Sequence, residues 1–389
     1  MQLIKLIFWI SFFAVLYSYI IYPLFLKLLS LFKKPNSIIY LPSEDLPKVS
    51  ILIAAFNEEK VIREKIESVL KSNYPASSIE IIVGSDSSTD LTNSIVEAIA
   101  AVDSRVSLVE FNQRSGKVTI INALVKLAIN PVLILTDANV IFSKITIYEL
   151  VKHFKNDSIA LVDSNMVNTG IKKDGISLQE KSYISAEVYI KHYEGLLWGT
   201  MMGPFGGCFA LRKSSYSPVP AHFLVDDFYL NMKVLQSGGK CINELNARVY
   251  EDVSNEAAIE FNRKIRIAAG SFQNLFLFLP SLLRINTISF CFFSHKVLRW
   301  KGPFFILFFY TCSILLYDQL FFRYFCWLTT FIICTPLIDY LLHRVLRINL
   351  LLLRFPAHFI TTNMALLFGF FRYIIGIQSG IWQPTKRHQ

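Results

Sequence analysis

The chain has 389 residues, of which 53% are hydrophobic, 14% aromatic and only 17% charged. Soluble domains carry about a quarter of charged residues, so this composition excludes intrinsic disorder, a collagen repeat and a small disulfide scaffold. A net charge of +10 would suit nucleic acid, anionic lipid or a phosphate-bearing ligand. Many basic residues flank apolar runs, as in residues 343–354, which is typical of membrane proteins and argues against nucleic acid.

The first element is an uncharged apolar run at residues 6–26, followed by Lys27, Lys33 and Lys34. A helix of about 20 residues crosses a bilayer, and no small-residue cleavage site follows this run. The sequence therefore predicts an uncleaved transmembrane anchor over residues 1–34. Its C-terminal end should face the cytoplasm, because basic residues gather on that side.

Residues 46–270 have the composition of a soluble domain, in which strand-like apolar runs alternate with helical patterns. The expected strands are residues 48–56, 79–83, 106–111 and 132–136, and the expected helices are residues 58–71, 90–102 and 117–128. This alternation predicts an α/β fold with a mainly parallel sheet. Ligands of such sheets bind at the carboxyl ends of the strands.

Apolar character returns after residue 270. Residues 271–301 contain Pro280 and Arg284 and predict interfacial helices rather than a membrane span. A C-terminal transmembrane region is expected at residues 302–378, with candidate spans at residues 302–317, 324–338 and 355–377, followed by a cytoplasmic tail at residues 379–389. The sequence allows either two or three C-terminal spans. Three would place the basic tail on the outer side of the membrane, against the preference of basic residues for the cytoplasmic side.

Polar side chains follow three of the predicted strands: Asn57, Glu58 and Glu59, then Asp86 and Asp90, then Asp137 and Asn139. Carboxylates that meet at one sheet edge repel one another unless a cation or hydroxyl groups hold them, so this cluster indicates a ligand site. Asp90 is equally well explained as a helix cap. The turn after the first strand contains no glycine, which disfavours a dinucleotide-binding dehydrogenase.

Seven short motifs follow one another in the middle of the chain: residues 54–59, residues 85–90, Gly116-Lys117 with Asn122, residues 137–139, residues 203–207, Asp226-Asp227 and residues 263–266. In this order they resemble the membrane-bound family 2 glycosyltransferases. The resemblance implies an inverting enzyme with a GT-A-type, Rossmann-like domain at residues 46–270. About one N-terminal and two or three C-terminal transmembrane helices would flank that domain.

The resemblance also implies the residues that bind the nucleotide-sugar donor: Asn57, Glu58, Asp86, Lys117, Asp137, Arg263 and Arg266. Lys117 would meet a phosphate beside a glycine that permits close approach. Arg266 would help to hold the departing diphosphate. Arg263 stands at the family's glutamine position and Ile267 at its tryptophan position, which leaves long-chain processivity open. A basic helix at a membrane surface is the alternative.

Asp137 and Asn139 stand where the family has an Asp-x-Asp metal motif. Alternation along a strand would place both side chains on one face. Their hard oxygen atoms suit Mg²⁺ or Mn²⁺, although an amide binds a divalent cation less strongly than a carboxylate. The expected metal ligands are therefore Asp137 and Asn139.

Asp226 and Asp227 match the family's acidic pair, whose second member acts as the base, so Asp227 is the expected base and Asp226 an orienting residue. Helix capping is the alternative. The glycine-rich segment that contains Phe205, Gly206 and Gly207 resembles the acceptor-side loop of the family. Close backbone approach and carbohydrate stacking suit these residues, and a tight turn is the alternative.

These features predict transfer of a sugar from a nucleotide-linked, UDP-type donor to a membrane-associated glycan or lipid-linked acceptor in cell-surface polysaccharide synthesis. The expected partners are the donor, the acceptor and membrane lipids. The catalytic domain should lie on the cytoplasmic side of the cell membrane in a multi-pass protein. The alternatives are an inactive membrane scaffold, which would lack the acidic set, and a transporter, which would carry ionisable groups within its spans.

Residues 382–387 are loosely similar to a gating loop over the nucleotide.

Overall fold

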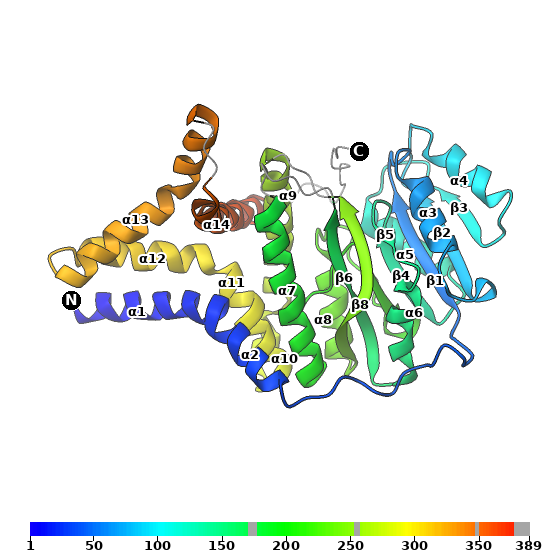
Figure 1. The fold of residues 1–389 in the computed structure, drawn as a ribbon, viewed down its shortest axis with the longest axis horizontal. Coiled ribbons are helices and arrows are strands. Elements are labelled where there is room, and N and C mark those ends of the chain that lie inside the picture. Colours follow the sequence, from blue (N-terminus) through cyan, green and yellow to red (C-terminus); the bar gives the residue numbers. More distant parts are fainter. Residues whose placement is uncertain (170–176, 253–256, 347–349, 377–389) are drawn as a thin grey trace. The chain divides into compact units, whose positions relative to one another are not determined.

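The computed structural model describes residues 1–169, 177–252, 257–346 and 350–376, and the chain forms two compact units (Figure 1). The sheet unit comprises Leu29–Gly170 and Ile184–Val253. The helical unit comprises Met1–Leu28, Ile171–Tyr183 and Ser254–Gly376. The predicted tail at residues 379–389 and the gating segment at residues 382–387 lie outside the described residues.

In the described part of the sheet unit, eight strands form one sheet in the order β3-β2-β1-β4-β7-β6-β8-β5. Their bounds are β1 Val49–Ala55, β2 Ile79–Ser85, β3 Val106–Glu110, β4 Val132–Asp137, β5 Ile141–Phe142, β6 Ile159–Thr169, β7 Cys208–Arg212 and β8 Lys240–Asp252. The four predicted strands are confirmed, and β3, β2, β1 and β4 are mutually parallel. Because β7 runs antiparallel to both β4 and β6, the complete sheet is mixed.

The three predicted helices are also present, somewhat shorter than expected: α3 Ile62–Leu70, α4 Thr92–Ala100 and α5 Lys117–Leu127. Three further helices follow along the chain: α6 Thr146–Val151, α7 Ser177–Trp198 and α8 Asp226–Gln236. The helices α3 to α5 connect parallel strands, which require a crossover of this kind. The adjacent strands β1, β2 and β4 thus end at one edge of the sheet.

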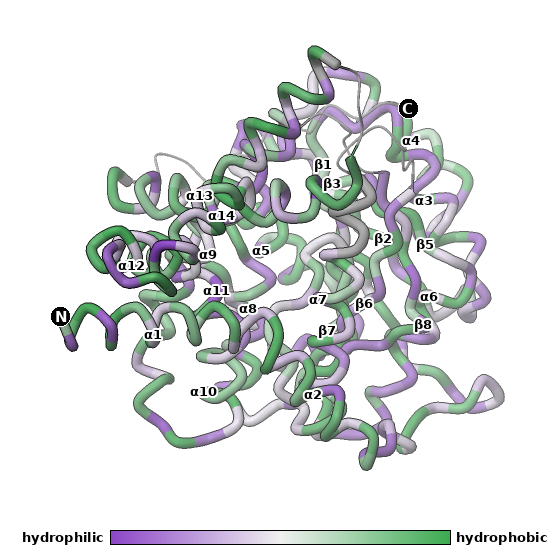
Figure 2. Tube along the Cα trace, turned by 60° about the vertical axis from the view of Figure 1, so that its left-hand side comes forward, coloured by the Kyte–Doolittle hydropathy of each residue, from purple (hydrophilic) through white to green (hydrophobic). Residues whose placement is uncertain are grey.

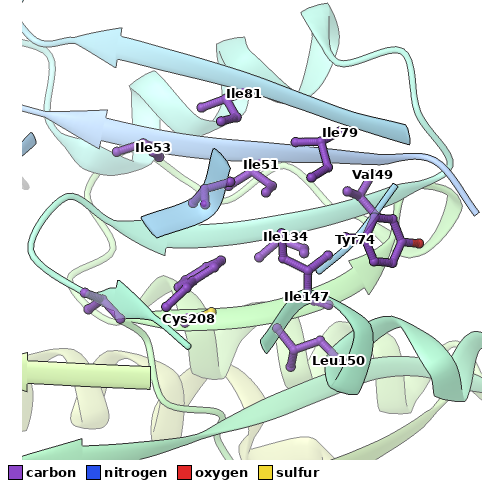
Figure 3. Packing of buried hydrophobic residues seen from close by; sticks show 14 of the residues in the cluster. Val49, Ile51, Ile53, Tyr74, Ile79, Ile81, Ile134, Ile147, Leu150 and Cys208 are labelled. Atoms are coloured by element: carbon purple, nitrogen blue, oxygen red, sulfur yellow. The ribbon is translucent and has the colours of Figure 1, made fainter. Parts of the chain in front are cut away.

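The core of the sheet unit is built from the apolar side chains of its parallel strands. Val49, Ile51 and Ile53 alternate along β1, and they belong to one buried cluster with Ile134 of β4 and Leu150 of α6 (Figure 3). Each fully buried aliphatic side chain stabilises the fold by about 2 kcal/mol. Apolar packing therefore determines where the strands end and where their polar loops begin.

Among the residues that the structure describes, three helices are long and apolar enough to cross a membrane: Gln2–Ser30, Leu320–Leu341 and Leu351–Ile375. The first consists of α1 Gln2–Leu16, a π-helical turn Tyr17–Ile21 and α2 Tyr22–Ser30, and the others are α13 and α14. Apolar residues dominate these segments in Figure 2. Of the expected one N-terminal and two or three C-terminal spans, one N-terminal and two C-terminal helices among the described residues have the required length and composition.

The remaining candidate span, predicted at residues 302–317, is a shorter helix. Helix α12 has 14 residues, Gly302–Leu315, or about 21 Å at 1.5 Å per residue, against a hydrocarbon core of about 30 Å. It packs on α1 and α13 through Phe8, Phe309 and Phe322. Residues 271–301 form the end of α9 Ala257–Phe278 and the short helices α10 Thr287–Cys291 and α11 Leu298–Trp300.

Candidate active site

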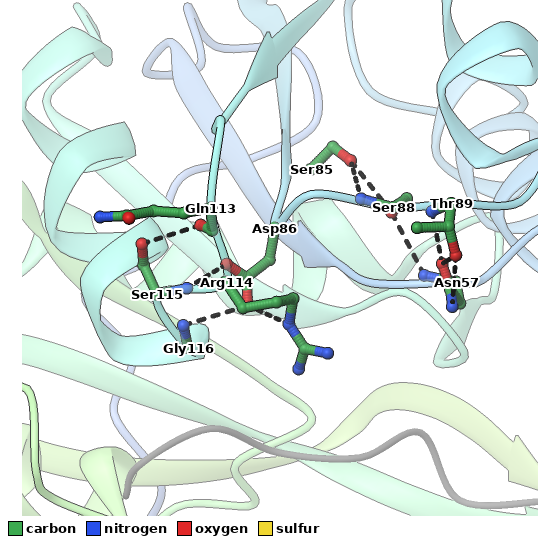
Figure 4. A network of polar contacts seen from close by, with 9 residues as sticks. All are labelled: Asn57, Ser85, Asp86, Ser88, Thr89, Gln113, Arg114, Ser115 and Gly116. Atoms are coloured by element: carbon green, nitrogen blue, oxygen red, sulfur yellow. Dashed lines mark hydrogen bonds and ion pairs between the residues drawn. The ribbon is translucent and has the colours of Figure 1, made fainter.

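The carboxylate of Asp86 is fully buried and holds the loop that precedes α5. Its Oδ1 accepts the backbone N–H of Ser115 at 2.6 Å, and its Oδ2 accepts the N–H of Gly116 at 3.0 Å. The Nε of Arg114 donates to Oδ2 at 3.1 Å, and the Arg114 guanidinium stacks on the ring of Phe56. Asp86 thus joins the end of β2 to the start of α5 (Figure 4).

The loops after β1 and β2 are joined in a similar way. The Oδ1 of Asn57 accepts the backbone N–H of Thr89 at 2.8 Å, and the backbone N–H of Asn57 donates to Ser88 Oγ at 3.2 Å (Figure 4). The backbone of Asn57 has a φ of +54°, which asparagine tolerates better than most residues. The N–H of Glu58 donates to Thr92 Oγ1 at 2.8 Å. The predicted donor-binding residues of these loops therefore occupy one connected region.

Lys117 and Asp137 form an ion pair at the carboxyl end of β4. The Nζ of Lys117 lies 2.6 Å from Asp137 Oδ1 and 3.3 Å from the carbonyl oxygen of Gly206. Burial by itself lowers the pKa of Lys117, but the carboxylates of Asp137, Asp226 and Asp227 outweigh this effect and raise that pKa above its usual value. The ammonium group therefore stays charged where a phosphate could meet it.

The position of Asn139 corrects one prediction. Strand β4 ends at Asp137, and Ala138 and Asn139 lie in a turn, so strand alternation does not place Asp137 and Asn139 on one face. The turn forms because the N–H of Val140 bonds back to the carbonyl of Asp137 at 3.3 Å. The Nδ2 of Asn139 instead donates to Glu251 Oε1 of β8 at 3.0 Å. Local sequence contained no signal for this contact between a turn and a distant strand.

The side chains at this edge include oxygen donors of the kind that bind a divalent cation. Asp137 offers a carboxylate whose side chain is 36% exposed, and Asn139 adds an amide oxygen. Mg²⁺ is usually held by one or two carboxylates, with phosphates and water in the remaining positions. Among the described residues, no group of three or more His, Cys, Asp or Glu side chains could hold a metal. Asp137 and Asn139 would leave the remaining positions of a divalent cation to phosphates and water.

Asp226 and Asp227 begin α8, as the sequence predicts. The Oδ1 of Asp227 accepts the N–H of Phe228 at 2.7 Å, and Oδ2 lies so close to Gly206 that a Cβ there would be 2.5 Å away. Burial, and then the charge of Asp226, raise the pKa of Asp227 well above its usual range. A carboxylate with a raised pKa is a stronger proton acceptor once it is ionised.

The glycine-rich segment at residues 203–207 is held by buried polar side chains. The N–H of Gly203, where φ is +76°, donates to Asn231 Oδ1 at 3.0 Å. The N–H of Phe205 donates to Asp163 Oδ1 at 2.7 Å. A Cβ at Gly207 would lie 2.6 Å from the ring of Phe205. The sequence-based reasoning missed Asp163 and Asn231, because neither stands beside a recognisable motif.

Lys65 is a further residue that was missed. It is fully buried on α3, and its Nζ donates to Thr136 Oγ1 at 2.8 Å and to the carbonyl of Val140. Burial lowers its pKa to about 7. Thr136 Oγ1 in turn donates to the carbonyl of Gly207 at 2.9 Å. The sequence did contain a signal for its burial, because Lys65 lies on the same helix face as the apolar Ile62, Ile66 and Val69.

The basic residues of the predicted diphosphate element lie on α9 in the helical unit. Arg263 forms two hydrogen bonds with the carboxylate of Glu260, both at 2.9 Å. Arg266 lies one turn further along the same helix. The donor-binding role of both arginines stays a prediction.

Residues 50–219 match the family described as Glycosyl transferase family 2. A probable glycosyltransferase of Bacillus subtilis, YdaM, is 34% identical over 120 residues, which are 30% of this chain and 29% of that protein. A poly-beta-1,6-N-acetyl-D-glucosamine synthase of Staphylococcus aureus is 27% identical over 128 residues, 33% of this chain and 29% of that protein. The chain thus spans less than a third of the length of these curated relatives.

A solved structure of the mannosyltransferase PcManGT from Pyrobaculum calidifontis, in complex with GDP-Man and Mn²⁺, has a TM-score of 0.72 and 18% identity over 95% of this chain and 99% of that chain. Together with the parallel strands β3, β2, β1 and β4 and the polar residues at their ends, this likeness defines a GT-A-type domain. Residues 50–219 are thus similar to glycosyl transferase family 2.

Proposed function

We propose that the chain is an inverting glycosyltransferase that moves a sugar from a nucleotide-linked, UDP-type donor to a membrane-associated glycan or lipid-linked acceptor in cell-surface polysaccharide synthesis. One observation carries the proposal: Gly206 contacts both the Asp227 carboxylate and the Lys117 ammonium group. The proposed proton acceptor, Asp227, and a cationic side chain that suits a phosphate, Lys117, therefore lie at one backbone segment. Single displacement needs both groups close to the anomeric carbon.

In the proposed reaction, Asp227 takes the proton of an acceptor hydroxyl that Asp226 orients. The acceptor oxygen forms a bond to the anomeric carbon while the bond to the nucleotide diphosphate breaks, and the diphosphate leaves with the electron pair. Lys117 offsets negative charge on the leaving group. A divalent cation held by Asp137 and Asn139, Mg²⁺ or Mn²⁺, would supply further charge stabilisation.

The other site residues have binding roles in this proposal. Donor contacts come from Asn57, Glu58, Asp86, Lys117 and Asp137, with Arg263 and Arg266 of α9. Acceptor contacts come from the loop that contains Phe205, Gly206 and Gly207. The loops after β1 and β2 are connected by hydrogen bonds, which supports a shared nucleotide site.

A membrane-associated acceptor is supported by the three apolar helices and by the names of two relatives. One is the poly-beta-1,6-N-acetyl-D-glucosamine synthase above, and the other is a beta-monoglucosyldiacylglycerol synthase of Nostoc, 23% identical over 156 residues. Lys27, Lys33 and Lys34 follow the first apolar helix. The positive-inside rule then puts the catalytic domain of a multi-pass protein in the cytoplasm.

The test is a screen of the full-length protein in lipid nanodiscs against UDP- and GDP-linked sugars, with Mn²⁺ or Mg²⁺, for release of the nucleoside diphosphate. Asp227→Asn is the background control, because it keeps the shape of the side chain and removes the base. We expect at least one donor to be turned over, and Asp227→Asn to reduce turnover by about 10²- to 10⁴-fold. A protein that binds nucleotide and turns over no donor would instead be a scaffold.

A further inference from the structure

A buried ion pair that the proposed reaction does not use lies beside the glycine-rich loop. Lys191 Nζ of α7 is 2.6 Å from Asp163 Oδ2 of β6, and the two side chains are only 5% and 0% exposed. Asn243 Nδ2 of β8 donates to the same oxygen at 3.0 Å. Burying each ion costs several kcal/mol, so such a pair is weak evidence for a stabilising role. Its other contacts indicate what it does.

The second oxygen of Asp163 connects the pair to the candidate active site. Asp163 Oδ1 accepts the backbone N–H of Phe205 at 2.7 Å. The next residue, Gly206, touches the Asp227 carboxylate and accepts a hydrogen bond from Lys117. One hydrogen bond thus connects the buried Asp163 carboxylate to the backbone segment that contacts Asp227 and Lys117.

This bond controls a part of the chain that no sheet or helix holds. Residues 203–205 have no regular secondary structure. The carbonyl of Phe205 accepts the N–H of Cys208 at 3.0 Å, and its own N–H is held by the Asp163 side chain. A buried N–H that loses its partner costs about 1–3 kcal/mol, and the loop would turn to find another partner. Such a turn would move Gly206 relative to Asp227.

We propose that Asp163 is a positioning residue for sugar transfer, which fixes Gly206 against Asp227 through the Phe205 amide, while Lys191 and Asn243 hold the Asp163 carboxylate in that orientation. The inference rests on the proposed function. The hydrogen bonds of Asp163 lead to Lys191, Asn243 and the Phe205 amide, so in this inference it acts through the backbone of the loop. Loss of this contact should therefore affect the transfer step more than donor binding.

Two double variants test the contact. Asp163→Asn/Lys191→Gln and Asp163→Leu/Lys191→Met both remove both charges. Apolar replacement of a whole buried pair is often neutral for stability, and the unpaired Phe205 amide adds a cost of about 1–3 kcal/mol in the second variant. Only the first still presents an oxygen atom to the Phe205 amide. If the second does not fold, Asp163→Ser/Lys191→Met replaces it, since the serine hydroxyl stops one bond short of the amide.

The measurements are kcat, the donor Kd and hydrogen–deuterium exchange of the peptide that contains residues 203–207, all on the full-length protein. We expect Asp163→Leu/Lys191→Met to lower kcat by about 10²-fold, to speed exchange in this peptide and to leave the donor Kd unchanged. Asp163→Asn/Lys191→Gln should behave like the wild type in all three measurements.

Three results would overturn the inference. The first is normal kcat in the Leu/Met variant, and the second is unchanged exchange at residues 203–207. The third is an equal loss of kcat in both double variants, which would assign the effect to charge or to stability instead of the hydrogen bond. A wild-type protein that turns over no donor would refute the proposed function itself, whereas active wild type with any of these three results refutes only the positioning role.

Discussion

The carboxylate of Asp227 rests against the backbone of Gly206, where an added Cβ would lie 2.5 Å from Oδ2. The carbonyl of Gly206 also accepts a hydrogen bond from Lys117 Nζ at 3.3 Å. Any side chain at this position would therefore displace the proposed base. The glycine is required by close approach and not by its backbone conformation, since its φ is not positive.

The first prediction follows from that contact. Gly206→Ala should lower kcat by about 10²-fold, because the methyl group pushes the Asp227 carboxylate out of position. Donor affinity and the unfolding temperature should change little. Gly238→Ala is the control: its φ is +88° with open space around it, so it should cost about 1 kcal/mol of stability and leave kcat unchanged. Normal turnover in Gly206→Ala would disprove the contact with the base.

The second prediction concerns the pH dependence of transfer. Burial and the charge of Asp226 raise the pKa of Asp227, and only the ionised carboxylate accepts a proton, so kcat should rise with pH as Asp227 ionises. Asp226→Asn removes a neighbouring negative charge, which lowers the pKa of Asp227 and moves the rise to lower pH. Profiles of kcat against pH for both proteins check this, and a shift to higher pH would contradict it.

The third prediction separates donor binding from proton transfer. Asp137→Ala should weaken metal-dependent donor binding, measured by calorimetry with Mn²⁺ or with EDTA, and should leave the fold intact because this partly exposed side chain ends a strand. Asn139→Asp adds a carboxylate and should preserve or tighten metal binding. If Asp137→Ala retains normal metal dependence, Asp137 is not a ligand. If Asn139→Asp loses binding, the amide serves its hydrogen bond to Glu251.

The fourth prediction uses the buried Lys65, whose pKa burial lowers from 10.5 to about 7. Between these two values the unfolded chain binds a proton that the folded chain does not, so this group makes stability increase as the pH rises. Lys65→Met should remove that increase. Unfolding of the full-length protein in detergent, followed from pH 7 to about 9.5, should show the difference.

The control for Lys65 is Lys71→Met, because Lys71 is 70% exposed on the end of the same helical segment. This variant should keep the pH dependence of the wild type. Parallel stability curves for Lys65→Met and the wild type would show that Lys65 titrates normally in the folded protein.

The sequence by itself determined the local elements of this protein. The strands β1 to β4, the helices α3 to α5 and the start of α8 at Asp226 are confirmed, because apolar periodicity and helix-start residues act over short distances. The apolar spans follow from composition alone. The order of the family motifs predicted that Asp86, Lys117, Asp137 and Asp227 belong to the site.

Only the tertiary structure decided how these residues are held. Asn139 meets Glu251 across 112 residues, and Asp163 meets Phe205 across 42, contacts that depend on the strand order β4-β7-β6-β8. The turn at Asn139 and the burial of Lys65 likewise depend on neighbours from other elements. Local periodicity indicates which face of an element is buried, but the partner that satisfies a buried polar group is chosen by chain segments far away in sequence.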